Sequence, residues 1–311
     1  MMDYSQLKGQ LQQDGFVVLK GLLTLDEVKH YIARMELLSG IRYRAEEIAK
    51  GGMSKRGLEQ SWYLPDGVTK MRDFWPLITD ERLLTAVRQL LNSNIRFLQH
   101  TDLHVGFSAI SWHRDNVCRT FGQGSDWDES QEPYQLVRVG LYLQTYEESH
   151  FRLGFIPGSH CPPEGKVTLR QKLNEAKLNS LGTLSYVFTR FQERASNGVW
   201  ITTEPGDCII FDPRAIHSGS YIIGPKYSIF LGYGVENSHF SNHKNYYRHL
   251  RPELNYQEPD PELVAQLRAE NLYPENVVDS DQIEEAWVPP ALMRKLVDQK
   301  REEAADRVTQ M

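Results

Sequence analysis

The chain has 311 residues, 40% of them hydrophobic and 24% charged, which provides enough apolar material to bury a folded core. Its net charge of −6 argues against nucleic acid as the main partner, because neutralising phosphates requires a concentrated basic surface. Three cysteines without metal-site spacing favour a reducing compartment, and no run approaches the roughly 18 apolar residues of a membrane span, so we expect a cytoplasmic protein.

The first part of the chain, residues 1–92, alternates apolar runs with polar breaks. Its predicted elements are a strand at 16–19, a helix at 24–38, a loop at 42–67 and a helix at 79–91. Thr24 and Glu27 have the spacing of a capping box, which predicts the start of the first helix. In the loop, Lys55 and Arg56 are predicted to be solvated, with closure over an anionic substrate or cofactor as the alternative.

The apolar period changes from 3.6 to 2 over residues 93–235, which predicts a mainly β core. The predicted strands are 95–98, 103–107, 136–144, 155–156, 199–202, 208–211 and 226–234. Within 136–144 the odd positions are apolar and the even ones carry Arg, Gly, Tyr and Gln, so one face should pack and the other should line a pocket. Residues 118–134 are predicted to form a lid loop, with a plain surface loop as the alternative, and 165–198 a helical insertion.

The C-terminal part, residues 236–311, is more polar. Residues 239–261 are predicted to be a polar and aromatic loop, and a charged helix is predicted from Ala291. Further helix starts are predicted at Pro261, Pro289 and Pro290. The apolar stripe of the last helix should cap the core or form a homodimer contact. We find no internal repeat, and we expect residues 1–311 to form a single domain.

His113 and Asp115 are two residues apart in the sequence Ser-Trp-His-Arg-Asp-Asn. On a β-strand this spacing directs both side chains to one face and the intervening side chain away. An imidazole and a carboxylate on one face form half of a metal site, and a second imidazole about a hundred residues downstream would complete a 2-His-1-carboxylate facial triad for iron(II). Taken alone, such a tripeptide also occurs on ordinary surface strands.

Four motifs taken together resemble the phytanoyl-CoA dioxygenase family of iron(II)- and 2-oxoglutarate-dependent oxygenases. They are Asp14-Gly15-Phe16-Val17-Val18 with the capped helix after it, Trp112-His113-Arg114-Asp115-Asn116, Phe155-Ile156-Pro157-Gly158-Ser159-His160, and Gly206-Asp207-Cys208-Ile209-Ile210-Phe211 leading into His217-Ser218-Gly219. The set spans residues 11 to about 235 in the family's order. No single motif is specific, but the ordered set is.

The resemblance implies a mainly β fold with flanking helices around a double-stranded β-helix, a cupin-like jelly-roll. It implies iron(II) held by His113, Asp115 and His217, with 2-oxoglutarate as cosubstrate and dioxygen as oxidant. The implied activity is hydroxylation of an unactivated C–H bond in a small or medium organic metabolite, with release of succinate and carbon dioxide. Related halogenases have a small residue in place of the carboxylate, so Asp115 favours hydroxylation or an oxidative variant of it.

One position departs from the family's pattern. Where the family usually has an arginine that grips the distal carboxylate of 2-oxoglutarate, this sequence has Lys226, which supplies the charge without the two-pronged fork. Gln99 is predicted to be a second contact to the cosubstrate, with a cross-strand hydrogen bond as the alternative. Arg119 and Arg138 are candidates to meet a carboxylate or phosphate on the substrate.

The departure at Lys226 keeps two other functions open. One is a non-catalytic family member that binds a metal or ligand, which predicts no succinate formation. The other is an iron or zinc hydrolase or isomerase on the same fold, which would be active without 2-oxoglutarate. Of the other histidines, His160 is assigned to a structural turn, and His100 and His104 are predicted to lie in the core or solvent, with support of the metal site as the alternative.

Overall fold

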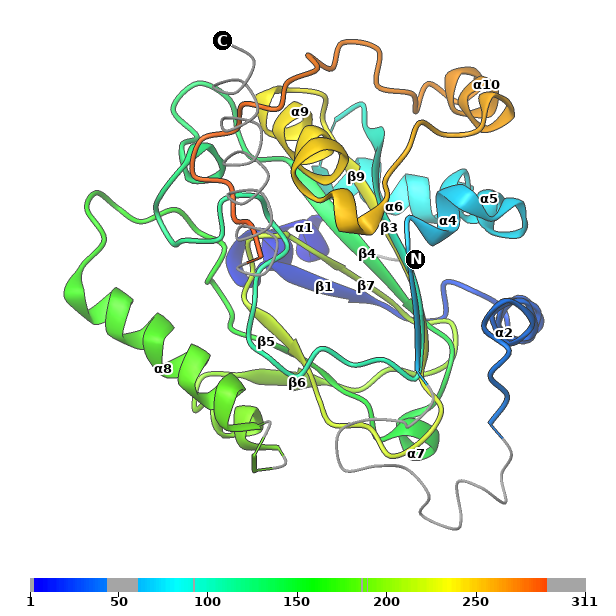
Figure 1. Ribbon diagram of the computed structural model, residues 1–311, viewed down its shortest axis with the longest axis horizontal. Helices are drawn as coiled ribbons and strands as arrows, with labels where there is room; N and C mark the ends of the chain where they lie inside the picture. The colour runs from blue at the N-terminus through cyan, green and yellow to red at the C-terminus, as the bar shows by residue number, and fades with distance from the viewer. Residues whose placement is uncertain (1–2, 44–60, 92, 186, 189, 290–311) are drawn as a thin grey trace, which may run out of the picture.

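Two antiparallel sheets form the centre of the protein (Figure 1). The computed structural model describes residues 3–43, 61–91, 93–185, 187–188 and 190–289. The larger sheet has the strand order β1-β7-β4-β9-β3-β2, with β1 (Phe16–Leu19), β2 (Trp62–Pro65), β3 (Arg96–Val105), β4 (Leu136–Tyr142), β7 (Cys208–Phe211) and β9 (Tyr227–Gly234). The smaller sheet has the order β6-β5-β8, with β5 (Leu153–Phe155), β6 (Val199–Ile201) and β8 (His217–Gly219). The fold is therefore mainly antiparallel β with flanking helices, as predicted.

The helices lie mostly around the larger sheet, while α8 projects from the opposite side of the molecule (Figure 1). They are α1 (Tyr4–Asp14), α2 (Leu25–Ser39), α4 (Gly67–Lys70), α5 (Trp75–Ile78), α6 (Glu81–Leu91), α7 (Tyr146–Ser149), α8 (Leu169–Ser185), α9 (Ser238–Asn245) and α10 (Pro261–Ala269). Shorter helical turns are η1 (Arg72–Phe74), η2 (Ser125–Trp127), η3 (Phe191–Arg194), the π-helical turn η4 (Tyr246–Leu250) and η5 (Pro252–Leu254). None of the helices that the structure describes is long and apolar enough to cross a membrane.

The two faces of the larger sheet bury different side chains. The odd positions of β4, Val137, Val139 and Leu141, belong to the main apolar core that the sheet shares with the helices. The opposite face meets the smaller sheet, where the ring of Phe155 stacks on Phe16 with 4.4 Å between the ring centroids. The alternation predicted for this strand is thus confirmed, and the space between the two sheets is lined by the other set of side chains.

Local signals place several helix ends correctly. Thr24 and Glu27 form the complete capping box at the start of α2, with each side chain bonding the backbone of the other. Pro261 is the first residue of α10, as its fixed φ and missing N–H predict. The predicted helical insertion contains α8.

Three predicted boundaries are wrong. Part of the loop expected at 42–67 is strand β2, because its backbone pairs with β3 at the edge of the sheet. The strands expected at 95–98 and 103–107 are one strand, β3, with an irregular register between Leu98 and Asp102. The loop expected at 239–261 begins inside α9, where Asn237 caps the helix by accepting a hydrogen bond from the backbone of Phe240.

Three expectations lie outside the described residues. They are the closure role of Lys55 and Arg56, the helix start at Pro290 and the charged helix from Ala291.

Candidate metal centre

Two histidines that are far apart in sequence are joined by their backbones. The N–H of His113 donates to the carbonyl oxygen of His217 at 3.0 Å, and the N–H of His217 donates back to His113 at 2.9 Å. The N–H of Asp115 also donates to the carbonyl oxygen of Pro213, at 2.8 Å. The His-x-Asp segment lies outside the named strands, but this pairing still directs its two ligand side chains to one side, as the spacing predicted.

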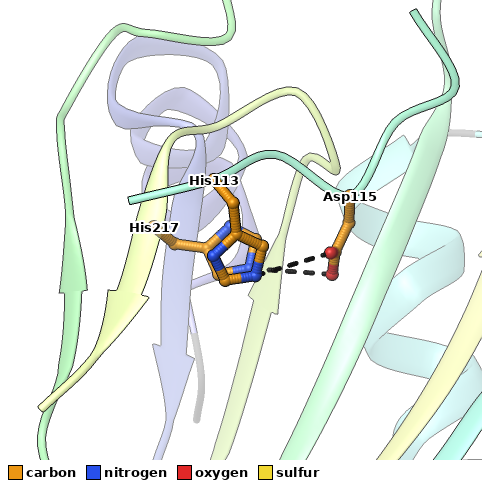
Figure 2. A group of neighbouring side chains, drawn as sticks. All are labelled: His113, Asp115 and His217. Carbon is orange, nitrogen blue, oxygen red and sulfur yellow. Dashed lines mark ion pairs between the residues drawn. The ribbon is translucent and has the colours of Figure 1, made fainter. Parts of the chain in front are cut away.

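The imidazole rings present the same nitrogen to Asp115 (Figure 2). In each ring Nδ1 lies next to a carbonyl oxygen two residues earlier, at 2.7 Å for His113 and 3.0 Å for His217. Because a carbonyl can only accept, each Nδ1 carries the proton and each Nε2 keeps its lone pair. The two Nε2 atoms lie 3.8 Å and 3.6 Å from the carboxylate oxygens of Asp115, and the three ligand atoms all lie within 4.8 Å of one another.

The protonation states suit a divalent cation. Burial lowers the pKa of His217 to about 4 and also lowers the pKa of His113, so both rings are neutral near pH 7. Burial alone would raise the pKa of Asp115, but the neighbouring His217 and Arg138 bring it below its ordinary value. Two neutral imidazoles and one carboxylate are the donor set that iron(II) takes in a facial triad, so these residues fit the implied metal.

The middle residue of the motif anchors the centre to its surroundings. Arg114 points away from the two ligands, and its guanidinium makes two hydrogen bonds to the carboxylate of Glu175 on α8, at 2.6 Å and 2.7 Å. It also lies over the rings of Phe121 and Trp127, which belong to the loop predicted to be a lid. Helix α8 and this loop are therefore tied to the His-x-Asp segment through one buried side chain.

A cavity of about 270 Å³ opens beside the three side chains, between the two sheets. Its walls are largely aromatic, with Phe107, Phe151, Phe211, Phe230 and Tyr247 among them. Such a cavity can bind a small organic molecule and exclude water from it.

Arg138 lies in this cavity with its charge already paired. Its side chain is 3% exposed, and its Nη2 donates to the carboxylate of Asp102 at 2.8 Å. It also bonds the carbonyl oxygen of His100, and its Nε lies 3.6 Å from Asp115. Arg138 therefore balances Asp102 and lies at ion-pair distance from Asp115, and it is not a free cation for a substrate.

Lys226 lines the same cavity and has no paired carboxylate among the described residues. Its Nζ donates to the carbonyl oxygen of Phe107 at 2.8 Å and to the hydroxyl of Ser228 at 2.9 Å. It also lies 4.6 Å from the ring centroid of Phe151. Burial lowers the pKa of Lys226 to about 7.

Gln99 is not among the residues that line the cavity. Its amide nitrogen donates to the carboxylate of Asp66 at 2.9 Å and to the carbonyl oxygen of Gln257 at 2.7 Å. These contacts occupy the amide elsewhere, so the structure does not bring Gln99 to the three ligands.

Asp102, Tyr247 and Arg251 line the cavity but were not predicted as site residues, and His100 and His104 were given a role beside the metal only as the alternative. His100, Asp102 and His104 alternate along β3 and all line the cavity. Their period of two was present in the sequence, but dividing the strand at this point concealed it. Tyr247 lies in the turn η4 and Arg251 directly follows it, in a region that was expected to be loop, so no periodic signal pointed to them.

The comparisons with known proteins agree with this architecture. The sequence profile of the phytanoyl-CoA dioxygenase (PhyH) family matches residues 11–226. No curated protein matches the chain. The fold is similar to that of SnoN, a non-heme alpha ketoglutarate dependent epimerase from nogalamycin biosynthesis, with 18% identity over 75% of this chain and 83% of that chain and a TM-score of 0.50.

Two further solved structures have the same fold. SnoK, a non-heme alpha ketoglutarate dependent carbocyclase from nogalamycin biosynthesis, is 13% identical over 75% of this chain and 84% of its own, with a TM-score of 0.51. HygX from Streptomyces hygroscopicus, solved with nickel, 2-oxoglutarate and hygromycin B bound, is 16% identical over 74% of this chain and 86% of its own, with a TM-score of 0.50. At these identities the likeness is one of fold.

Proposed function

The chain belongs to the phytanoyl-CoA dioxygenase family, and we propose that it is an iron(II)- and 2-oxoglutarate-dependent dioxygenase that hydroxylates a small or medium organic metabolite. The observation that carries this proposal is the group of His113, Asp115 and His217, whose ligand atoms lie within 4.8 Å of one another beside an aromatic cavity. In the proposal these three residues hold the iron. Bound iron(II), with 2-oxoglutarate and dioxygen, supplies the oxidant for C–H cleavage as the oxo acid is converted to succinate and carbon dioxide.

The chain's own residues prepare the site. The two ring N–H groups, each held by a backbone carbonyl, keep the Nε2 lone pairs of His113 and His217 directed at one point. The charge of Arg138, 3.6 Å from Asp115, helps to keep that carboxylate ionised. In the proposal Lys226 binds the distal carboxylate of 2-oxoglutarate. Three observations support this role: the ammonium has no carboxylate partner among the described residues, it is buried, and it lines the cavity.

Binding of 2-oxoglutarate should depend on pH through Lys226. The carboxylate pairs with the ammonium form, and burial lowers the pKa of Lys226 to about 7 in the free protein. As the pH rises above that value, a growing fraction of Lys226 must take up a proton before it can bind, so the affinity should fall by up to about tenfold per pH unit. We expect this fall between about pH 7 and pH 9 in anaerobic titrations with iron(II).

The control is Lys226→Arg, because a guanidinium stays protonated over this range. Its affinity for 2-oxoglutarate should not vary with pH, whereas Lys226→Ala should bind weakly at every pH. The same slope in wild type and Lys226→Arg would remove Lys226 from the proposed cosubstrate site.

The test of the function itself is the visible absorption of the anaerobic protein with iron(II), before and after 2-oxoglutarate is added. A charge-transfer band that requires both ligands indicates chelation of the metal by the oxo acid. If the band is absent even at high 2-oxoglutarate, the oxygenase proposal fails. Metal-dependent activity without 2-oxoglutarate would then favour a hydrolase or isomerase, and a metal complex without turnover would favour a binding role.

The reaction type needs a separate measurement, because the neighbouring structures include an epimerase and a carbocyclase. The proposed hydroxylation transfers one oxygen atom from dioxygen to the product and the other to succinate. Turnover under isotopically labelled dioxygen, followed by mass spectrometry, should therefore label both products. A substrate-derived product without the label would replace hydroxylation by another oxidative outcome.

A further inference from the structure

Arg119 stands where two cavities meet. A second cavity, of about 240 Å³, lies beside α8 and is lined by Glu175, Asn179 and Trp287 among others. His113 and Arg119 line both this cavity and the one that contains the three ligands. A molecule that extends from the second cavity toward the metal ligands would therefore pass Arg119.

The cavity of the three ligands contains more positive charge than its own carboxylates balance. Arg138 is paired with Asp102, at 2.8 Å. Arg251 is paired with Glu253, which lies two residues further along the chain. By contrast, Arg119 forms no ion pair and no hydrogen bond with any described residue. Its Nε is buried and has no hydrogen-bond partner. A buried donor without a partner is costly unless a ligand satisfies it.

The cosubstrate does not account for this charge. In the proposed site the oxo acid end of 2-oxoglutarate meets the metal, and its single distal carboxylate meets Lys226. Lys226 contacts Phe107, Phe151 and Ser228, whereas Arg119 contacts Trp287 and lowers the pKa of Asp115. The two cations thus have different surroundings, and Arg119 is left without an anionic partner among the described residues.

Trp287 holds Arg119 in a fixed position. The guanidinium carbon lies 4.0 Å from the centroid of the indole ring. The backbone N–H of Trp287 donates to the carbonyl oxygen of Val117 at 2.9 Å, and its carbonyl accepts from the hydroxyl of Tyr246 at 2.6 Å. Stacking uses the face of the guanidinium and leaves the N–H groups at its edge to bind an oxyanion with two parallel hydrogen bonds.

We propose that the substrate is an anionic metabolite whose carboxylate, phosphate or sulfate group binds Arg119, with its carbon skeleton in the aromatic cavity beside the three ligands. This inference rests on the proposed function, since it assigns Lys226 to 2-oxoglutarate. Arg119 is then the residue that determines specificity for acidic substrates, and it positions them by a group remote from the reacting carbon.

The test uses inorganic sulfate as the probe. Sodium sulfate is titrated calorimetrically into the full-length protein, anaerobic and saturated with iron(II) and 2-oxoglutarate so that Lys226 is occupied. We expect saturable binding that is weakened at least about tenfold in Arg119→Gln, since a charge-assisted pair is lost. Arg170→Gln, which changes an exposed arginine on α8, is the matched control and should bind like wild type. Lys226→Gln should lose affinity for 2-oxoglutarate and keep its affinity for sulfate.

Three results of the sulfate experiment would overturn the inference. They are no sulfate binding in wild type, equal binding in wild type and Arg119→Gln, and displacement of 2-oxoglutarate by sulfate. Weakened 2-oxoglutarate binding in Arg119→Gln, read from the charge-transfer band, would assign Arg119 to the cosubstrate instead and equally overturn it. Failure of the proposed function gives a different result, because the charge-transfer band would then be missing in wild type with or without sulfate. A repeat of the sulfate titration without iron and 2-oxoglutarate would still measure binding at Arg119.

Discussion

The His217→Ala variant should fold but lose both the charge-transfer band with iron(II) and 2-oxoglutarate and the formation of succinate. The imidazole supplies one of three proposed ligands, whereas the hydrogen bonds that join it to His113 come from the backbone and survive the substitution. Removing a residue that only hydrogen-bonds to a metal ligand typically lowers metal affinity or activity by roughly 10- to 100-fold. We expect a larger loss of activity here, because His217 is itself a proposed ligand. Anaerobic absorption, metal content and succinate release measure the effect, and circular dichroism checks the fold.

A matched control for this variant is His249→Ala. His249 also contacts a carboxylate, with its Nε2 2.7 Å from Asp279, but it is not among the residues that line the cavity. It should keep the band and the activity. If His217→Ala keeps an undiminished band, His217 is not a metal ligand and the proposed centre is wrong.

The Arg138→Met variant should show the largest loss of stability. It removes one partner of a buried ion pair and leaves the carboxylate of Asp102 in a site where its residue is 4% exposed. Breaking such a pair costs about 3–5 kcal/mol of the free energy of unfolding, because an uncompensated charge remains buried. Urea denaturation should detect this as a lower midpoint, and the double variant with Asp102→Asn should recover part of the loss.

The loss should also grow as the pH rises. Burial already raises the pKa of Asp102 in the wild type, and removing Arg138 raises it further, so the folded variant binds a proton more tightly than the unfolded chain does. Below about pH 4 the carboxyl of Asp102 is protonated in both the folded and the unfolded variant, and no buried charge destabilises the fold. As the pH rises from there through the pKa of Asp102 in the folded variant, the free energy of unfolding falls. Unfolding curves at pH 5 and pH 8 should differ more for the variant than for wild type.

An exposed ion pair provides the control for this experiment. Arg88→Met breaks the contact with Glu81 on α6, where both side chains are solvent-exposed and their charged atoms are 3.8 Å apart. The expected loss is below about 1 kcal/mol and nearly independent of pH. Equal losses in Arg88→Met and Arg138→Met would contradict the importance of the buried pair.

Elements with local causes were predictable from the sequence. The capping box at Thr24 and the first-turn position of Pro261 depend on neighbours within three or four residues. The alternation along β4 predicted one packed face and one pocket face because side-chain direction repeats every two residues. The same rule placed His113 and Asp115 on one side. Helix α9 was missed because its buried residues are mostly polar, although Asn237 was a usable cap signal.

The composition of the cavity was decided only by the tertiary structure. From the sequence, Arg119 and Arg138 were equivalent candidates for an anion, but Asp102 on β3 forms an ion pair with Arg138, and no described carboxylate forms one with Arg119. Whether a charge is free depends on distances between residues from different strands, which no periodic pattern encodes. Trp287, beside Arg119, comes from a distant part of the chain. The sequence by itself therefore predicted a mainly β core from its periodicity, and the resemblance carried by its ordered motifs implied the jelly-roll fold and the three candidate ligands. Only the packing of distant segments decided which cation is left for a substrate.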